Sequence, residues 1–143
     1  MKKEEPAIKF TVEKILTVDD MDDILTTALE GGIGYWARLM SDDPDWIKAE
    51  EQLKAKGVEL YWSTVALQVL LNGDSIKMMD AEEAPDSPDL VIWTLDMKKF
   101  KHGCALFEQE RGSITGMLED GSFDAVEADC LIQYGVFGEV QFG

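Results

Sequence analysis

Residues 17–36 read TVDDMDDILTTALEGGIGYW, and their first half contains the clearest helix signal in the chain. Thr17 stands three residues before Asp20, a spacing that predicts a capping box at a helix start. Four aspartates follow closely, where the positive end of the helix dipole stabilises them. Gly31 and Gly32 are expected to end this helix. One apolar face is predicted from side chains at helical spacing, namely Val18, Met21, Ile24, Leu25, Ala28 and Leu29.

The segment before this helix alternates between apolar and polar side chains. Ile8, Phe10 and Val12 would face one way, and the residues between them would face the other. A period of two predicts a half-buried strand over residues 7–16. Residues 1–6 are expected to be flexible.

Downstream, the signals alternate between helix and strand without a regular order. Residues 33–40 form a short amphipathic or aromatic-rich segment, and residues 58–71 fit either a strand or a helix, of which we favour a helix from residue 63. A loop with three glycines is expected around residues 112–121. The other expected helices cover residues 45–56, 96–109 and 124–137. The expected strands cover residues 75–80, 90–95 and 139–142, and an acidic loop, residues 81–89, joins the first two.

These elements predict an α+β fold. We expect a small, mainly antiparallel sheet of three or four strands, with four or five helices packed on it, in a single globular domain over residues 1–143. Strands and helices do not alternate regularly enough for a doubly wound parallel sheet.

The composition is strongly acidic. The chain of 143 residues has a formal net charge of −16 and a pI near 4.2, and no Lys or Arg follows Arg111. Hydrophobic residues make up 45% of the chain, which favours a folded protein over a disordered acidic tail. This charge repels nucleic acid and anionic membranes and attracts cationic grooves on proteins. We therefore expect a partner protein with a basic groove, no direct nucleic-acid binding and no membrane association.

The chain shows no sequence sign of export or membrane insertion. Its start, MKKEEP, lacks the apolar region of a signal peptide, and no uncharged apolar run approaches the roughly 18 residues that cross a bilayer. Cys104 and Cys130 lie far apart in apolar surroundings, which predicts free thiols. These features predict a cytoplasmic protein.

Catalytic chemistry has little support in the sequence. The single histidine, His102, lies beside Lys101 and is expected at the surface. No nucleophile elbow, phosphate-binding loop or calcium-binding loop is present. We expect no catalytic residues, no metal site and no cofactor.

Two local motifs are more specific. The first joins Glu30 to Tyr35 and Trp36 through paired glycines, and the second places Asp129 and Gln133 four residues apart on one helix face, followed by Glu139. One interpretation is structural, with Trp36 in the core and the polar side chains bound to backbone groups. The alternative is a ligand or interaction site made of Glu30, Tyr35, Trp36, Asp129, Gln133 and Glu139.

The same two segments resemble a group of small acidic proteins encoded by phages and prophages of Gram-positive bacteria. The likeness covers roughly a quarter to a third of the chain, at its two ends. It implies a phage setting and supplies no catalytic residues. It rests on Asp20–Asp23, EGG at 30–32, Tyr35 and Trp36, ADC at 128–130, Gln133, FGEV at 137–140 and Gly143.

The phage setting and the acidity together favour a non-enzymatic counter-defence protein in the bacterial cytoplasm. Its acidic surface would imitate DNA in the groove of a host nucleic-acid-binding protein, for example a CRISPR or restriction effector. One alternative is a protein that sequesters a nucleotide signal, with Tyr35 and Trp36 stacked on its base. A phage structural or assembly protein, which could form a homo-oligomer, is another. The candidate acidic surface comprises Asp19, Asp20, Asp22, Asp23, Asp42, Asp43, Asp45, Glu82, Glu83 and Asp86, extended by Asp80 and Asp89.

Overall fold

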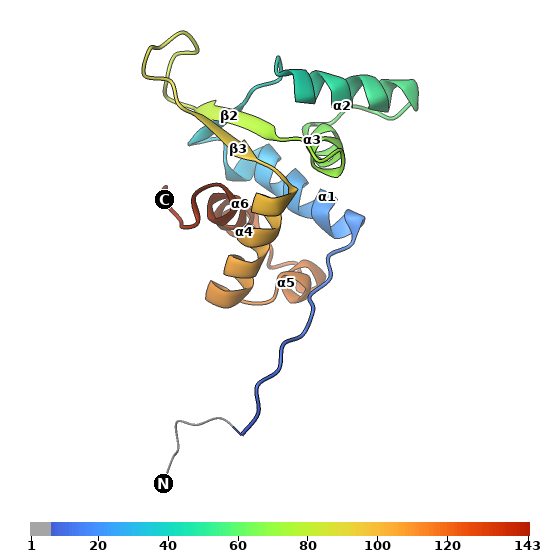
Figure 1. Cartoon of the computed structure of the whole chain (residues 1–143), viewed down its shortest axis with the longest axis vertical. Coiled ribbons are helices and arrows are strands. Elements are labelled where there is room, and N and C mark those ends of the chain that lie inside the picture. The colour runs from blue at the N-terminus through green and yellow to red at the C-terminus, as the bar shows by residue number, and fades with distance from the viewer. Residues whose placement is uncertain (1–6) are drawn as a thin grey trace.

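Six α-helices and a three-stranded antiparallel sheet make up the described part of the chain, residues 7–143 of the computed structural model (Figure 1). The α+β fold class is therefore confirmed. The expected flexibility of residues 1–6 lies outside the described residues. The helices are α1 (Val18–Thr27), α2 (Pro44–Ala55), α3 (Trp62–Leu71), α4 (Met97–Glu110), α5 (Ile114–Asp120) and α6 (Ala125–Phe137), with a π-helical turn η1 (Ala28–Gly32) after α1. The strands are β1 (Ala37–Leu39), β2 (Ile76–Asp80) and β3 (Ile92–Leu95).

The sheet has the order β1-β2-β3, and both pairs are antiparallel. Ala37 pairs with Asp80, and Ile76 pairs with Leu95. The hairpin of β2 and β3 with its acidic loop is confirmed. Strand β1 was not predicted, because a strand of three residues is too short to show a period of two.

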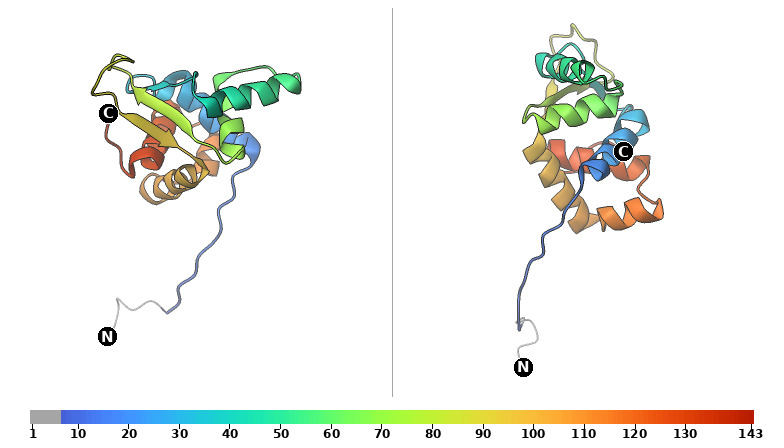
Figure 2. Two further views of the ribbon diagram at one scale, coloured as in Figure 1. Left: turned by 45° about the horizontal axis from the view of Figure 1, so that its top comes forward. Right: turned by 90° about the vertical axis from the view of Figure 1, so that its right-hand side faces the viewer.

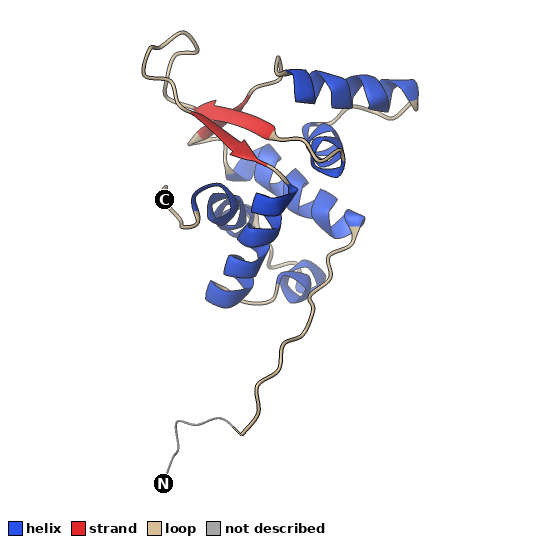
Figure 3. Ribbon diagram, in the orientation of Figure 1, coloured by secondary structure: helices blue, strands red, loops and turns tan. Residues whose placement is uncertain are grey.

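The helices form the bulk of the molecule, and the sheet lies at one end of it (Figure 3). Local signals explain the predicted helices: the capping box of Thr17 and Asp20 is present, and the side chains of Asp96 and Asp124 cap α4 and α6. The core is built from side chains on several of these elements, including Leu25, Leu70, Met78, Phe107 and Leu131, each at most 1% exposed.

The crossing of α4 and α6 depends on two glycines. A Cβ atom on Gly103 would lie 2.7 Å from the backbone oxygen of Leu131 and 2.8 Å from the backbone nitrogen of Gly135. A Cβ on Gly135 would lie 2.9 Å from the backbone oxygen of Lys99. Gly103 weakens the helix signal in the sequence, and the structure shows that it permits this close backbone approach.

The helical segment that starts with α1 ends at the glycine pair, as expected, and its last turn is the π-helical turn η1. At the end of this turn, the N–H of Ile33 donates to the oxygen of Ala28 at 3.0 Å. A Cβ on Gly32 would lie 3.0 Å from the backbone oxygen of Ala125 in α6. Gly32 therefore lets η1 approach α6.

The predicted strand over residues 7–16 is wrong. This segment, which we call the N-terminal arm, runs away from the body in an extended conformation and pairs with no strand in the described chain (Figure 2). A period of two shows that a segment suits a sheet, but a strand also needs a partner edge. The arm has none here.

The three-glycine loop and the C-terminal segment also differ from expectation. The loop contains the helix α5, which Ser113 caps by accepting from the N–H of Gly116. Seven residues are too few for a clear helical period. Residues 139–142 form no strand, because their backbone binds a side chain of α6 instead.

Candidate functional site

The two sequence motifs meet in space around the carboxylate of Asp129. Asp129 accepts hydrogen bonds from the hydroxyl of Tyr35 at 2.6 Å and from the indole N–H of Trp36 at 2.7 Å. Gln133, one helical turn further along α6, donates to the same carboxylate at 2.9 Å. η1 and the turn after it bring Tyr35 and Trp36 to α6.

Gln133 extends this network to the C-terminal segment. Its side-chain oxygen accepts from the backbone N–H groups of Gln141 and Phe142, both at 2.8 Å. Its side-chain nitrogen donates to the backbone oxygen of Phe142 at 3.1 Å. We call Tyr35, Trp36, Asp129, Gln133 and this bound backbone the Asp129 network.

An aromatic cluster packs beside the network. Trp36 is 2% exposed and stacks on Phe142 with ring centroids 5.3 Å apart and an interplanar angle of 6°. Trp93 from β3 and Phe137 from α6 lie at 5.6 Å and 5.3 Å from Trp36. The C-terminal segment therefore closes over the indole of Trp36.

Sequence reasoning found four members of this site and missed two. It did not single out Trp93 or Phe142, because their approach to Trp36 depends on tertiary packing. Glu30 and Glu139 were predicted to belong to the site, but both are exposed and make no hydrogen bond with the Asp129 network in the described chain.

Each buried polar group of the network has a hydrogen-bond partner within the protein. No buried side-chain nitrogen or oxygen among residues 7–143 lacks a hydrogen-bond partner. Gln133 is fully buried and Asp129 is 7% exposed, so neither offers a free polar group to a ligand. The arrangement joins three distant segments of the chain, in line with the structural interpretation.

Burial, followed by the hydrogen bond to Asp129 and the charge of Asp129, raises the pKa of Tyr35 from 10.0 to about 12. An unfolded tyrosine loses its proton near pH 10, before the folded one does. The stability that Tyr35 contributes is therefore present below pH 10 and is lost as the pH rises toward 12.

We expect the Cζ resonance of Tyr35 in ¹³C-tyrosine-labelled protein to titrate with a midpoint near pH 12. The chain has three tyrosines, so a Tyr35→Phe variant assigns the signal by its loss. A midpoint near pH 10 would show that the hydroxyl does not hold its bond to Asp129 in solution.

The acidic residues at the start of α1 differ in their roles. Asp20 accepts from the backbone N–H of Thr17 at 3.0 Å and so belongs to the cap. Partial burial and the charges of Asp23 and Asp19 raise the pKa of Asp22. Asp19 and Asp23 are exposed. The α1 acidic surface, as we call these four aspartates, is a region of concentrated negative charge.

Asp43 and Asp45 are held by an ion pair within the protein. The ammonium group of Lys77 on β2 lies 3.1 Å from the Asp43 carboxylate and 2.5 Å from the Asp45 carboxylate. Asp43 also caps α2, and the hydrogen bond from Lys77 lowers the pKa of Asp45. Both carboxylates thus stabilise the junction of α2 with β2, whereas Asp42 is exposed.

The acidic loop between β2 and β3 carries the third set. Glu82 and Asp86 are exposed and Glu83 is half-buried. Arg38 on β1 donates to the backbone oxygen of Glu83 at 2.7 Å, which ties the loop to the sheet. This loop lies at the end of the molecule where α2 lies, whereas α1 starts where the arm leaves the body (Figures 1 and 2).

The single histidine and the two cysteines lie outside the Asp129 network. His102 is exposed, and both cysteines are free thiols, as predicted. Burial raises the pKa of Cys104 to about 12, which keeps the thiol protonated and unreactive at neutral pH. Within residues 7–143, no three His, Cys, Asp or Glu side chains are grouped to hold a metal ion. No helix in this part of the chain is both long and apolar enough to cross a membrane.

Comparisons of the chain with models of protein families, with curated proteins and with solved structures return no match.

Proposed function

We propose that this protein is a non-enzymatic, phage-type inhibitor that occupies the basic groove of a host nucleic-acid-binding protein. The likeness of its two ends to small acidic phage proteins supports the phage setting. The observation that carries the proposal is the α1 acidic surface. DNA presents one negative charge per roughly 1.7 Å of its axis, so a groove built for DNA favours a dense set of carboxylates.

Ion pairing distinguishes this surface from the other acidic sets. Among the described residues, none of the four aspartates of the α1 acidic surface forms an ion pair with Lys or Arg. The acidic residues that do form such pairs are Asp43, Asp45, Asp74, Glu108 and Glu127. Within residues 7–143, no ion pair therefore compensates the charge of the α1 acidic surface. The proposed contact surface is Asp19, Asp20, Asp22 and Asp23. The acidic loop between β2 and β3 lies at the other end of the molecule and is not part of it.

The nucleotide-binding alternative has no comparable support. Trp36 is buried and stacked on Phe142, and the polar groups of Asp129 and Gln133 bind other parts of the chain. Tyr35 alone keeps an exposed ring, at 51%.

A charge-reversal variant tests the proposal. We expect Asp19→Lys with Asp23→Lys to weaken inhibition of the target at least about tenfold, because both side chains are exposed and a basic groove would repel the new charges. The target is first recovered on the immobilised protein from nuclease-treated bacterial lysate and eluted along a salt gradient. Inhibition is then measured as competition with a labelled DNA duplex for that target.

The matched control is Glu51→Lys with Glu119→Lys, which changes the net charge equally at two exposed helical positions elsewhere. The control should inhibit like the wild type. Equal losses in both variants would assign the effect to net charge alone. Undiminished competition by the Asp19 and Asp23 variant, with its helical circular dichroism unchanged, would contradict the proposed surface.

A further inference from the structure

The N-terminal arm exposes a continuous set of apolar side chains. Ile8, Phe10 and Ile15 are 74–80% exposed and Val12 is 67% exposed, while the arm itself extends away from the body (Figure 1). Side chains of this size are rarely left uncovered in a row, and such patches mark binding surfaces. The alternation that predicts a strand here therefore indicates a segment that binds another surface.

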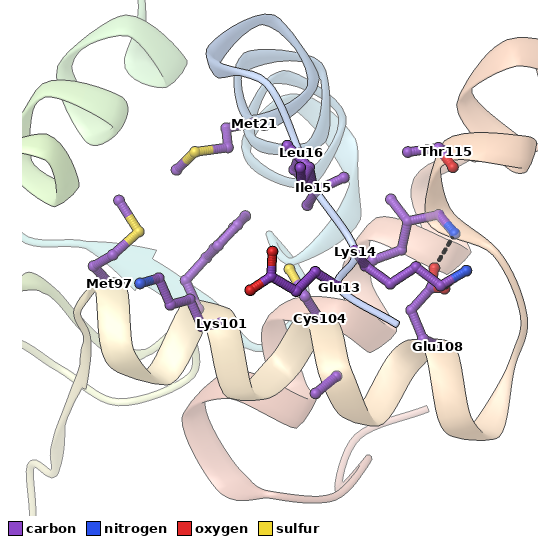
Figure 4. A pocket seen from close by; sticks show the side chains of 13 residues that line it. Glu13, Lys14, Ile15, Leu16, Met21, Met97, Lys101, Cys104, Glu108 and Thr115 are labelled. Carbon is purple, nitrogen blue, oxygen red and sulfur yellow. Dashed lines mark hydrogen bonds and ion pairs between the residues drawn. The ribbon is translucent and has the colours of Figure 1, made fainter. Parts of the chain in front are cut away.

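An apolar groove lies at the base of the same arm. Its volume is about 770 Å³, and α1, α4, α5 and arm residues 13–16 line it. We call it the α4 groove. Figure 4 shows Met97 and Cys104 of α4 on one side, facing Met21 of α1 and the arm. Most of its wall is apolar, with Met21, Met97, Phe100, Cys104, Ala105 and Ile114 as the apolar side chains of the helices.

The arm cannot easily fold back into the groove of its own chain. Leu16 already packs against the core, so a return would need a tight turn within residues 7–15. This segment contains no Gly, Pro, Asn or Asp, the residues that tight turns favour. Filling of the groove by the arm of another molecule is therefore favoured over a return of the chain's own arm.

Charge favours a second copy of this chain as that molecule. Residues 1–16 hold four Lys and three Glu, so the rest of the chain carries all of the negative excess. The arm is thus the part that can approach another acidic body without like-charge repulsion. Because each chain has one arm and one groove, a dimer with two-fold symmetry makes the arm–groove contact twice. No arm or groove then remains free to bind a third copy.

We propose that two copies exchange arms, with the arm of each seated in the α4 groove of the other. Ile8, Phe10 and Val12 share one face of the extended arm and enter the groove. The backbone of the incoming arm runs beside the extended residues 13–16 of the receiving chain. This dimer is independent of the α1 acidic surface and of the proposed inhibition.

Sedimentation velocity of the full chain from about 1 to 200 µM tests the dimer. We expect the wild type to dimerise in this range and Phe10→Asp to raise the dissociation constant at least about a hundredfold, because a charge would enter an apolar groove. Thr11→Asp adds the same charge on the opposite face of the arm and should dimerise like the wild type.

A mixing experiment separates arm–groove binding from contact between arms. Ala105→Arg places a bulky charge in the groove at an exposed position of α4, and alone it should be monomeric. A mixture with Phe10→Asp restores one intact arm and one intact groove, so heterodimers should form more tightly than either variant self-associates.

Three results would overturn the proposal. They are a wild type that stays monomeric at 200 µM, a dimer that Phe10→Asp leaves unchanged, and a mixture without rescue. A monomeric wild type whose arm captures a host protein would likewise replace the second copy by a foreign partner. Phe10 is 80% exposed, so its replacement should leave the fold intact, as circular dichroism can verify.

Discussion

We expect Asp129→Ala to lower the free energy of unfolding by about 3–5 kcal/mol, because it leaves the buried indole N–H of Trp36 without an acceptor. It also removes one acceptor each from Tyr35 and Gln133. The indole N–H of Trp36, the hydroxyl of Tyr35 and the side-chain amide of Gln133 all donate to this carboxylate. The loss is a large part of the roughly 5–15 kcal/mol that stabilises an ordinary domain. Urea denaturation followed by tryptophan fluorescence measures it.

Asp129→Asn separates hydrogen bonding from charge. The amide oxygen can still accept from Trp36 and Gln133, and the amide nitrogen can donate to the hydroxyl oxygen of Tyr35. The hydroxyl proton would then turn to the backbone oxygen of Phe142, which already lies 3.2 Å away. We expect a loss of only about 1 kcal/mol. Glu139→Ala, at an exposed acid outside the network, should change nothing measurable.

The same experiment reports on the C-terminal segment. If the network holds residues 141–142 in place, Asp129→Ala should also speed amide exchange at Gln141 and Phe142, whose N–H groups bind Gln133. A variant as stable as the wild type, with unchanged exchange at these two amides, would contradict the structural role of Asp129.

The second large effect is expected at the α4–α6 crossing. Gly103→Ala would place a methyl group 2.7–2.9 Å from backbone atoms of Leu131 and Gly135, which cannot move aside as a side chain does. Alanine alone favours a helix by about 1 kcal/mol over glycine. We nevertheless expect a net loss of about 2–3 kcal/mol in unfolding free energy, because the two helices must separate. Thermal and urea denaturation measure this loss.

Gly31→Ala is the matched control for this prediction. Gly31 also lies in a helical segment, but a Cβ there would meet nothing within 4 Å. This variant should be as stable as the wild type or slightly more stable. If both variants gained stability, helix propensity would dominate at both positions and the close crossing would not exist in solution.

Much of the helical structure could be predicted because its signals are local. The pattern of Met21, Ile24 and Leu25 and the cap of Thr17 and Asp20 are contained in α1 itself. The caps of α4 and α6 likewise come from residues adjacent to those helices. A local signal acts whatever the rest of the chain does, so it survives in the folded protein.

Besides the elements that were too short to predict, the remaining differences arise from contacts that the local pattern does not contain. The arm has the alternation of a strand but no neighbouring strand to pair with. The N–H groups of Gln141 and Phe142 donate to the side-chain oxygen of Gln133, so residues 139–142 do not pair with a strand. Gly103 lowers helix propensity, yet it makes the approach of α4 to α6 possible. In each case the outcome depends on residues outside the segment itself.

The candidate site likewise combines residues that the sequence identifies with contacts that only the fold creates. The sequence placed Asp129 and Gln133 on one helix face and put Tyr35 and Trp36 after a glycine pair. It could not show that these motifs meet, that Phe142 stacks on Trp36, or that Lys77 forms ion pairs with Asp43 and Asp45.

The sequence by itself determined the net charge, the positions of the main helices and the absence of recognised catalytic motifs, because each is set by composition or by neighbours along the chain. Only the tertiary structure decided which polar groups are satisfied internally and which apolar side chains remain uncovered. Hydrogen bonding and burial are properties of atoms in contact, and most of the deciding contacts here join residues far apart in the sequence.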